Sequence, residues 1–245
     1  MSSTSQPQMG SREWRDSVFC SGPARDNKGR SKHTQYHQRY SPTMKRLVGG
    51  QGRNECCALL ALDYLAVRGL VKRFKSQAFE TSTKEFGAKI VPDFLVEHQD
   101  DSLIVVEQKT SRFLTRDKQL ILDENKKKFA EFGLKYMSWT DRRPLNHAAR
   151  HNLINMNRFS GENIPVGEIE RLFSLVDEKR ALPLLKVHEA GFDLSCIYAA
   201  AWVGKIFFPI ASALSFETVI TAKPQEDLDS IFLDCQRSTD EWWRS

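Results

Sequence analysis

Two stretches of the sequence, residues 91–96 (VPDFLV) and residues 103–109 (LIVVEQK), decide the expected fold. The second stretch begins with four consecutive apolar residues, which is typical of a central strand buried on both faces. The polar residues between the two stretches predict a turn, so the two strands are expected to form a hairpin. In that hairpin Asp93 lies beside Glu107, and Lys109 shares a face with Glu107 because side chains alternate along a strand.

This grouping predicts metal-dependent chemistry. Two carboxylates held this close repel each other unless a cation lies between them. Ligand sets made only of oxygen suit Mg²⁺ or Mn²⁺. A neighbouring lysine can orient or deprotonate an attacking water and offset the negative charge that develops. We therefore predict a hydrolytic metal site at Asp93, Glu107 and Lys109.

Glu55 is a third acidic candidate, and the sequence supports two interpretations of it. It projects from the edge of the apolar stripe of a predicted helix, residues 54–67. A carboxylate that faces a core is costly unless it is paired or bound to metal. With Asn54 as the N-cap, Glu55 is also an acid of the first turn, favoured by the helix dipole. Both interpretations remain open.

The segments around the hairpin alternate between helical and strand patterns. Together they predict an α/β core in the order α-β-β-β-α-β, with a partly antiparallel sheet. The core elements are expected at residues 54–67 (helix), 71–81, 88–97 and 102–110 (strands), 115–132 (helix), 134–140 (strand) and 145–158 (a basic helix).

Beyond residue 160 the pattern is mostly helical, which predicts a small second domain for which a winged helix is one candidate. The helical patterns follow a linker at residues 160–162 and cover residues 166–177, 181–190, 194–203 and 205–221. The predicted domains are a basic flexible arm (1–44), a core domain (45–159), the helical domain (160–222) and an exposed acidic tail that contains Trp242 and Trp243 (223–245).

The net charge of +5 is concentrated at the N-terminus. Residues 1–50 carry nine Lys and Arg against three Asp and Glu, so the rest of the chain is close to neutral. A basic arm rich in Ser, Gly and Gln can neutralise the phosphates of a nucleic acid. The alternative is a flexible, solvated tail, so charge alone permits a nucleic-acid function without requiring one.

The composition argues against a membrane protein and against a secreted, disulfide-rich protein. No apolar stretch approaches the roughly 20 residues that span a bilayer. The N-terminus lacks the apolar segment of a secretory signal, and the five cysteines include no CxxC pair. We therefore expect a soluble, cytosolic protein with no membrane partner.

The motifs in the hairpin resemble those of the PD-(D/E)XK nuclease superfamily, whose core has the same order of elements. Pro92-Asp93 matches the first half of its motif and Glu107-Gln108-Lys109 the second, with thirteen residues between the two acids. The resemblance implies a metal-dependent endonuclease with a restriction-endonuclease-like core.

A narrower resemblance covers most of the chain. Residues 54–65 (NECCALLALDYL), 74–77 (FKSQ) and 91–96 look like the endonuclease subunit of heteromeric bacterial transposases, the TnsA type. The resemblance implies an enzyme of the bacterial cytosol that cuts the 5′ strands at transposon ends in double-stranded DNA. It also implies two protein partners, a DDE-type transposase that handles the 3′ strands and an AAA+ regulator.

The same resemblance assigns roles to individual residues. It implies that Glu55, Asp93, Glu107 and the main-chain carbonyl of Gln108 hold Mg²⁺, which Mn²⁺ can replace, and that Lys109 serves the water. The best-known member has glutamine at the position of Glu107, whereas glutamate is the commoner choice in the wider superfamily.

Basic residues near two predicted helices are candidates for contacts with the DNA backbone, and a solvated helix face is the alternative for each. Two rival functions also remain. One is another nuclease of the superfamily, such as a restriction, repair or junction-resolving enzyme of a phage or plasmid. The other is a catalytically inactive DNA-binding scaffold on the same fold. The candidate DNA-binding residues are Lys126, Lys127, Lys128, Arg142, Arg143 and Arg150.

Overall fold

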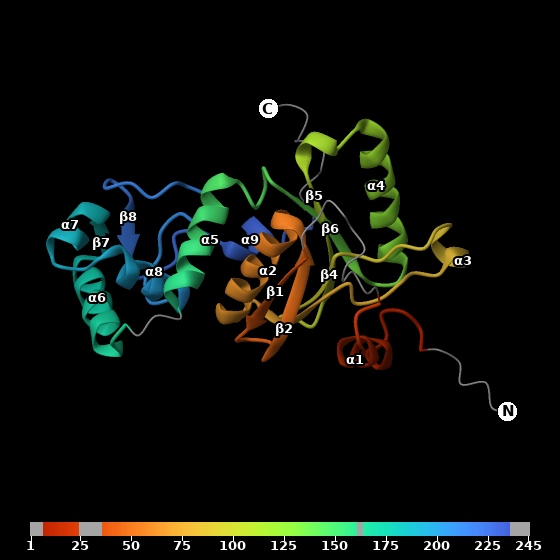
Figure 1. The fold of residues 1–245 in the computed structure, drawn as a ribbon, viewed down its shortest axis with the longest axis horizontal. Helices are drawn as coiled ribbons and strands as arrows, with labels where there is room; N and C mark the ends of the chain where they lie inside the picture. The colour runs from red at the N-terminus through yellow and green to blue at the C-terminus, as the bar shows by residue number, and fades with distance from the viewer. Residues whose placement is uncertain (1–6, 25–35, 161–163, 236–245) are drawn as a thin grey trace.

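A mixed sheet of four strands lies at the centre of the fold in the computed structural model, which describes residues 7–24, 36–160 and 164–235 (Figure 1). The strands are β3 (Val71–Ser76), β4 (Phe94–His98), β5 (Leu103–Lys109) and β6 (Lys135–Thr140), and they lie in the order β3-β4-β5-β6. β4 pairs antiparallel with both of its neighbours, β3 and β5, whereas β5 and β6 run parallel. The predicted α/β fold with a partly antiparallel sheet is confirmed.

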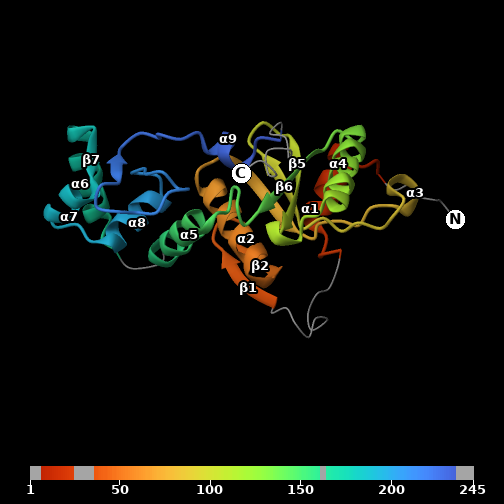
Figure 2. The ribbon, with the colours of Figure 1, turned by 90° about the horizontal axis from the view of Figure 1, so that it is seen from above.

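Helices cover both faces of this sheet, because its strands bury apolar side chains on both sides (Figures 1 and 2). α2 (Gly52–Val67) and α5 (His147–Ser160) pack on the face that carries Ile104 and Val106. α4 (Arg116–Glu131) connects β5 to β6 and packs on the opposite face, against Leu103 and Val105. A parallel strand pair requires such a crossover connection. The short helices η1 (Ser111–Phe113) and α3 (Thr83–Phe86) lie in the loops after β5 and β3.

The first two strands of the sheet, β3 and β4, are shorter than predicted. β3 ends at Ser76 because Gln77 has a φ of 47°, outside the extended region. β4 starts at Phe94, and the preceding Pro92 has no N–H to donate to a ladder. Asp93 therefore lies just before β4, at the start of the hairpin.

The N-terminal residues that the structure describes are not a flexible arm, so the prediction for residues 1–44 is wrong for this part of the chain. α1 (Arg12–Cys20) buries Val18 and Phe19 against the sheet face that α4 covers. The Lys75 ammonium donates hydrogen bonds to the Ser21 carbonyl (2.6 Å) and hydroxyl (2.9 Å) just after this helix. Two apolar residues in a polar segment are too few to show a period, and their packing partners lie far along the chain. Residues 1–6 and 25–35 of the predicted arm lie outside the described residues.

A hairpin that the sequence did not predict precedes α2. Its strands are β1 (Tyr36–Ser41) and β2 (Arg46–Gln51), which pair in antiparallel register. The hairpin is attached to α2 through Asp63, a fully buried carboxylate. Arg39 pairs with this carboxylate at 2.8 Å, and Thr43 donates a hydrogen bond to it at 2.9 Å.

The C-terminal region from residue 166 to residue 221 follows the order helix, strand, helix, helix, strand. These elements are α6 (Val166–Lys179), β7 (Ala181–Pro183), α7 (Leu184–Glu189), α8 (Leu194–Trp202) and β8 (Val219–Thr221), with β7 and β8 antiparallel. The predicted helix over residues 205–221 is wrong, because Phe207 forms a β-bridge with Thr221 and Pro209 interrupts the segment. α5 contacts both α2 and α8, so one buried cluster extends from the sheet into this region.

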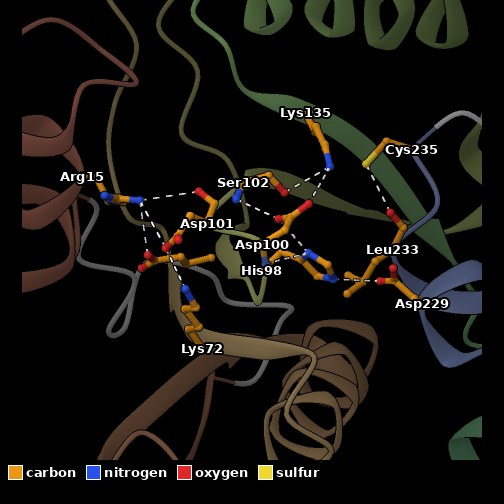
Figure 3. A network of polar contacts seen from close by, with 11 residues as sticks. Arg15, Lys72, His98, Asp100, Asp101, Ser102, Lys135, Asp229, Leu233 and Cys235 are labelled. Atoms are coloured by element: carbon orange, nitrogen blue, oxygen red, sulfur yellow. Dashed lines mark hydrogen bonds and ion pairs between the residues drawn. The ribbon is translucent and has the colours of Figure 1, made fainter.

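The segment predicted as an exposed tail returns to the sheet. α9 (Leu228–Phe232) buries Phe232, whose carbonyl accepts a hydrogen bond from the indole nitrogen of Trp139 at 2.9 Å. His98 bridges the strand and this segment, at 2.8 Å from Asp100 and 3.0 Å from Asp229 (Figure 3). The prediction is therefore wrong for residues 228–235, while Trp242 and Trp243 lie outside the described residues.

Within the described part of the chain, the helices are too short or too polar for any of them to cross a membrane.

Candidate active site

Asp93 and Glu107 lie side by side where β4 begins and β5 approaches its end. Phe94 pairs with Val106 in the antiparallel ladder, so the next pair outward is Asp93 with Glu107. The backbone N–H of Gln108 donates a hydrogen bond of 2.7 Å to Oδ2 of Asp93. The hairpin thus brings the two acids together on one face of the sheet, as the alternation of side chains along the strands indicated.

Lys109 lies on the same face as Glu107, one alternation further along β5. Its Nζ lies 2.5 Å from Oε1 of Glu107, and the side chains are 35% and 14% exposed. Burial opposes the charged form of Lys109, but the carboxylates of Glu107 and Asp93 outweigh it and raise the pKa of Lys109 above its ordinary value. Lys109 is therefore an ammonium at neutral pH, able to donate hydrogen bonds and unable to accept a proton.

Asp93 has the most unusual electrostatics of the group. Burial, followed by the negative charges of Glu107 and Glu55, raises the pKa of Asp93 from 3.8 to about 8, against the opposing charge of Lys109. Ionised Asp93, Glu107 and Glu55 would leave an excess of negative charge over the single ammonium of Lys109. Such an excess in a partly buried site is relieved by a proton or by a cation.

Glu55 takes the helix-end role, one of the two that the sequence left open. α2 begins at Gly52, not at Asn54, and Oε2 of Glu55 accepts a hydrogen bond of 2.7 Å from the N–H of Gln51 at the helix start. The charge of Glu55 nevertheless reaches the site, since it contributes to the raised pKa of Asp93. Gly50 is required beside it, because a Cβ at that position would lie 2.9 Å from the Cβ of Glu55.

The residues present fit a divalent cation in their donor chemistry. Asp93 and Glu107 offer carboxylate oxygens, and Gln108, between Glu107 and Lys109 in the chain, offers a main-chain carbonyl oxygen. Hard cations such as Mg²⁺ bind oxygen ligands of these kinds. Among the described residues, however, no three His, Cys, Asp or Glu side chains converge closely enough to form a complete cage. A cation here would depend on backbone carbonyl, water and phosphate oxygens in addition to the two acids.

Tyr136 is a residue of this site that the sequence did not indicate. Parallel pairing with β5 places it opposite Val105, on the face of Glu107, and its hydroxyl is buried. Burial, followed by the charge of Glu107, raises the pKa of Tyr136, so it remains a neutral phenol. Whether Tyr136 lies on the face of Glu107 depends on the register of β6 against β5, which no local sequence pattern specifies.

The predicted DNA-binding residues fall into three groups. Lys126 donates to the carbonyl of Cys235 at 2.8 Å, and Lys128 pairs with Glu124 at 2.6 Å, so both have contacts within the protein, whereas Lys127 is exposed. Arg142 and Arg143 are exposed immediately after β6. Arg150 is only partly exposed, and its guanidinium donates to Asn54 and to the carbonyl of Asp141.

Further exposed arginines surround the same end of the sheet. Arg53 lies in the first turn of α2, Arg112 in η1 directly after β5, and Arg116 at the start of α4. Together with Arg142 and Arg143 they form what we call the arginine rim. The sequence could have suggested Arg112 and Arg116, since each follows the end of the predicted strand that carries Lys109.

No protein-family model and no curated protein matches the chain. What the structure adds is the geometry of the motifs that carry the resemblance to TnsA-type nucleases. Residues 54–65 lie on α2, residues 74–77 end β3, and residues 91–96 lead into β4. Two of the three meet directly, because the N–H of Gln77 donates a hydrogen bond of 2.8 Å to the carbonyl of Asp93.

Proposed function

We propose that this protein is a metal-dependent DNA endonuclease with a PD-(D/E)XK core. The observation that carries the proposal is the adjacency of Asp93 and Glu107 at neighbouring strand positions, with Lys109 on the same face. Like charges at a partly buried position are unfavourable unless a counter-charge is bound. A structural role alone offers no reason to hold two carboxylates together in this way.

The roles of the residues follow from their chemistry. Asp93, Glu107 and the main-chain carbonyl of Gln108 would hold Mg²⁺ or Mn²⁺, with Glu55 at the edge of the site. The bound ion would supply a Lewis acid for a phosphate oxygen and lower the pKa of a water. Lys109, which is held protonated, orients the attacking water as a hydrogen-bond donor and stabilises the charge that develops on the phosphate. Its charge state favours this orienting role over deprotonation of the water.

The arginine rim supports DNA as the substrate. Its five members follow the ends of β5 and β6 or occupy the first turn of α2, so they surround the end of the sheet where Lys109 lies. Phosphate contacts from Arg and Lys supply most of the sequence-independent affinity for DNA. We therefore place the DNA backbone across this end of the sheet and leave Lys126 and Lys128 out of the interface.

The biological context that we propose is DNA transposition in the bacterial cytosol. The motifs of residues 54–65, 74–77 and 91–96 support a TnsA-type subunit that cuts the 5′ strands at transposon ends. The order α6-β7-α7-α8-β8 supports a winged-helix domain in the C-terminal half. A DDE-type transposase and an AAA+ regulator are the partners that this context implies.

The experiment that tests the proposal measures cleavage and ion binding on the full chain. Supercoiled plasmid and linear duplex DNA are incubated with Mg²⁺ or Mn²⁺, with and without excess EDTA. Mn²⁺ binding is measured in parallel by electron paramagnetic resonance, which needs neither DNA nor a partner protein. The variants are Asp93→Asn and Glu107→Gln, and Asp177→Asn, an exposed residue of α6, is the control.

We expect the wild type and the control to bind Mn²⁺ and to nick DNA, and both site variants to lose both properties. Undiminished cutting in excess EDTA would contradict the proposal. So would wild-type protein that binds Mn²⁺ no better than the doubly substituted Asp93→Asn, Glu107→Gln protein.

A further inference from the structure

Arg150 occupies a position between three segments that converge on the proposed site. Its Nη1 donates to Oδ1 of Asn54 at 3.1 Å, in the first turn of α2, and its Nη2 donates to the carbonyl of Asp141 at 3.1 Å, directly after β6. The amide of Asn54 in turn donates to Oγ1 of Thr110 at 2.9 Å. One guanidinium therefore connects α5, α2 and the ends of both parallel strands.

A fourth hydrogen bond closes these contacts into a ring. The N–H of Ser111 donates to Oδ1 of Asp141 at 2.6 Å, and Ser111 follows Thr110 in the chain. Burial opposes ionisation of Asp141, but the Ser111 hydrogen bonds and the charge of Arg150 hold the pKa of Asp141 below its ordinary value. The ring is thus held by charge as well as by geometry.

The ring acts on the residues next to its members. Asn54 precedes Glu55, and Thr110 follows Lys109, so the Asn54–Thr110 hydrogen bond sets the distance between the glutamate of α2 and the lysine of β5. Glu55 and Lys109 belong to elements that are remote in sequence, so their separation depends on tertiary contacts such as this hydrogen bond and the packing of α2 on β5. Misplacement of a reacting group by about 1 Å costs on the order of 10²-fold in rate.

We infer that Arg150 is a positioning residue, which places Glu55 and Lys109 through Asn54 and Thr110, and not a contact to the DNA backbone. The inference rests on the proposed function and refines it. Both terminal nitrogens of the guanidinium are used by protein acceptors, and Nε is buried. Arginine suits this role because its planar fork holds two acceptors in fixed directions, which a lysine cannot do.

The test separates positioning from DNA contact with substitutions on the same helix and the same rim. Arg150→Gln is compared with Arg158→Gln, an exposed arginine two turns further along α5, and with Arg142→Gln from the arginine rim. Three quantities are measured: the single-turnover cleavage rate at saturating DNA, the slope of log K for DNA against log[salt], and Mn²⁺ affinity without DNA.

For Arg150→Gln we expect a saturating rate lowered about 10- to 100-fold, a weaker Mn²⁺ affinity, and a wild-type salt slope. Arg142→Gln should flatten the slope, and Arg158→Gln should match the wild type. Asn54→Ala should reproduce the loss of rate, and the double variant Arg150→Gln, Asn54→Ala should be little worse than either single one, because both break the same ring. If Arg150→Gln does not fold, Asn54→Ala and Thr110→Val carry the same comparison.

Two results would overturn the inference alone. One is a flattened salt slope for Arg150→Gln with an unchanged saturating rate, which would make Arg150 a phosphate contact. The other is wild-type cleavage and Mn²⁺ binding in both Arg150→Gln and Asn54→Ala. Wild-type protein that neither binds Mn²⁺ nor cuts DNA would instead overturn the proposed function, and the positioning role with it.

Discussion

The backbone N–H of Gln108 donates a hydrogen bond of 2.7 Å to the carboxylate of Asp93, a residue 15 positions earlier in the chain. This hydrogen bond holds Asp93 against β5, although the negative charge of Glu107, which directly precedes Gln108, repels the Asp93 carboxylate. One oxygen of the acid is thereby oriented by the backbone. The site is consequently built by the ladder of two strands, and side-chain substitutions can alter its charge without removing its framework.

Replacement of Lys109 by alanine should separate catalysis from binding. The carboxylates remain, so Mn²⁺ and DNA should still bind, whereas single-turnover cleavage should fall by about 10²–10⁴-fold with the loss of one positioned donor and its charge. Single-turnover cleavage beside a DNA titration of the same variant measures both. If Lys109 only forms a surface ion pair with Glu107, worth at most about 1 kcal/mol, the variant will cut DNA as the wild type does.

Asp93→Asn should make the metal-free protein more stable at alkaline pH. The pKa of Asp93 is raised from 3.8 to about 8, so the folded state holds a proton that the unfolded state has lost between these values. The wild type should therefore lose stability as the pH rises from about 4 to about 8, and the asparagine variant should lack that loss, which at about 1.4 kcal/mol per pH unit is on the order of 4 kcal/mol between pH 5 and pH 8. Urea unfolding in EDTA at pH 5 and pH 8 measures the difference.

Stabilisation by Mn²⁺ at two pH values tests whether the ion binds the Asp93 carboxylate. It should raise the thermal midpoint of the wild type more at pH 8 than at pH 6, because at the lower pH the ion must displace a proton. Asp93→Asn should show no such increase. An equal increase in both proteins would mean that the ion binds elsewhere.

Asp63→Asn should destabilise the fold by about 3 kcal/mol, since it leaves the partly buried Arg39 without its counter-charge. Asp63 is fully buried, with Arg39 at 2.8 Å. Chemical unfolding measures the loss, and the exposed Asp177→Asn should change stability by less than about 0.5 kcal/mol. The double variant Asp63→Asn, Arg39→Gln should recover part of the loss, and additivity of the two single effects would contradict the pairing.

Substitutions in the arginine rim should change the salt dependence of DNA binding. Arg112→Gln combined with Arg142→Gln should reduce the slope of log K against log[salt] by about 2, at roughly 0.9 for each lost phosphate contact. Lys89→Gln, an exposed lysine in the loop after α3, is the control and should leave the slope unchanged. An unaltered slope in the double variant would place the DNA on another face of the molecule.

Local pattern predicted the central hairpin, although not the start of β4, because a strand pair joined by a short turn is specified by residues close in sequence. The apolar run before Glu107, the polar turn at residues 98–101 and the alternation of side chains together allow Asp93 to lie beside Glu107, and the register of β4 against β5 agrees. α4 and β6 were likewise predicted within a residue or two, because their apolar periods and Gly133 are visible in the sequence.

Prediction failed for segments that are ordered only by distant partners. α1 has two buried apolar residues, α9 has Phe232, and the expected helix at residues 205–221 instead provides β8 as a partner for β7. α1 and α9 have too few apolar residues of their own to show a period, whereas residues 205–221 are apolar enough but are interrupted by Pro209. Each gains its stability from surfaces formed elsewhere in the chain.

The sequence by itself determined which charged groups meet at the candidate site, since the acids and the lysine belong to a hairpin whose strands follow each other directly. Only the tertiary structure decided what surrounds them. The register of β6 places Tyr136 on the face of Glu107, and the carbonyl of Cys235, just after α9, accepts a hydrogen bond from Lys126. α5 brings Arg150 to Asn54, a residue 96 positions away. Such contacts depend on how complete elements pack, and the free energy of that packing is spread over many side chains that no short motif records.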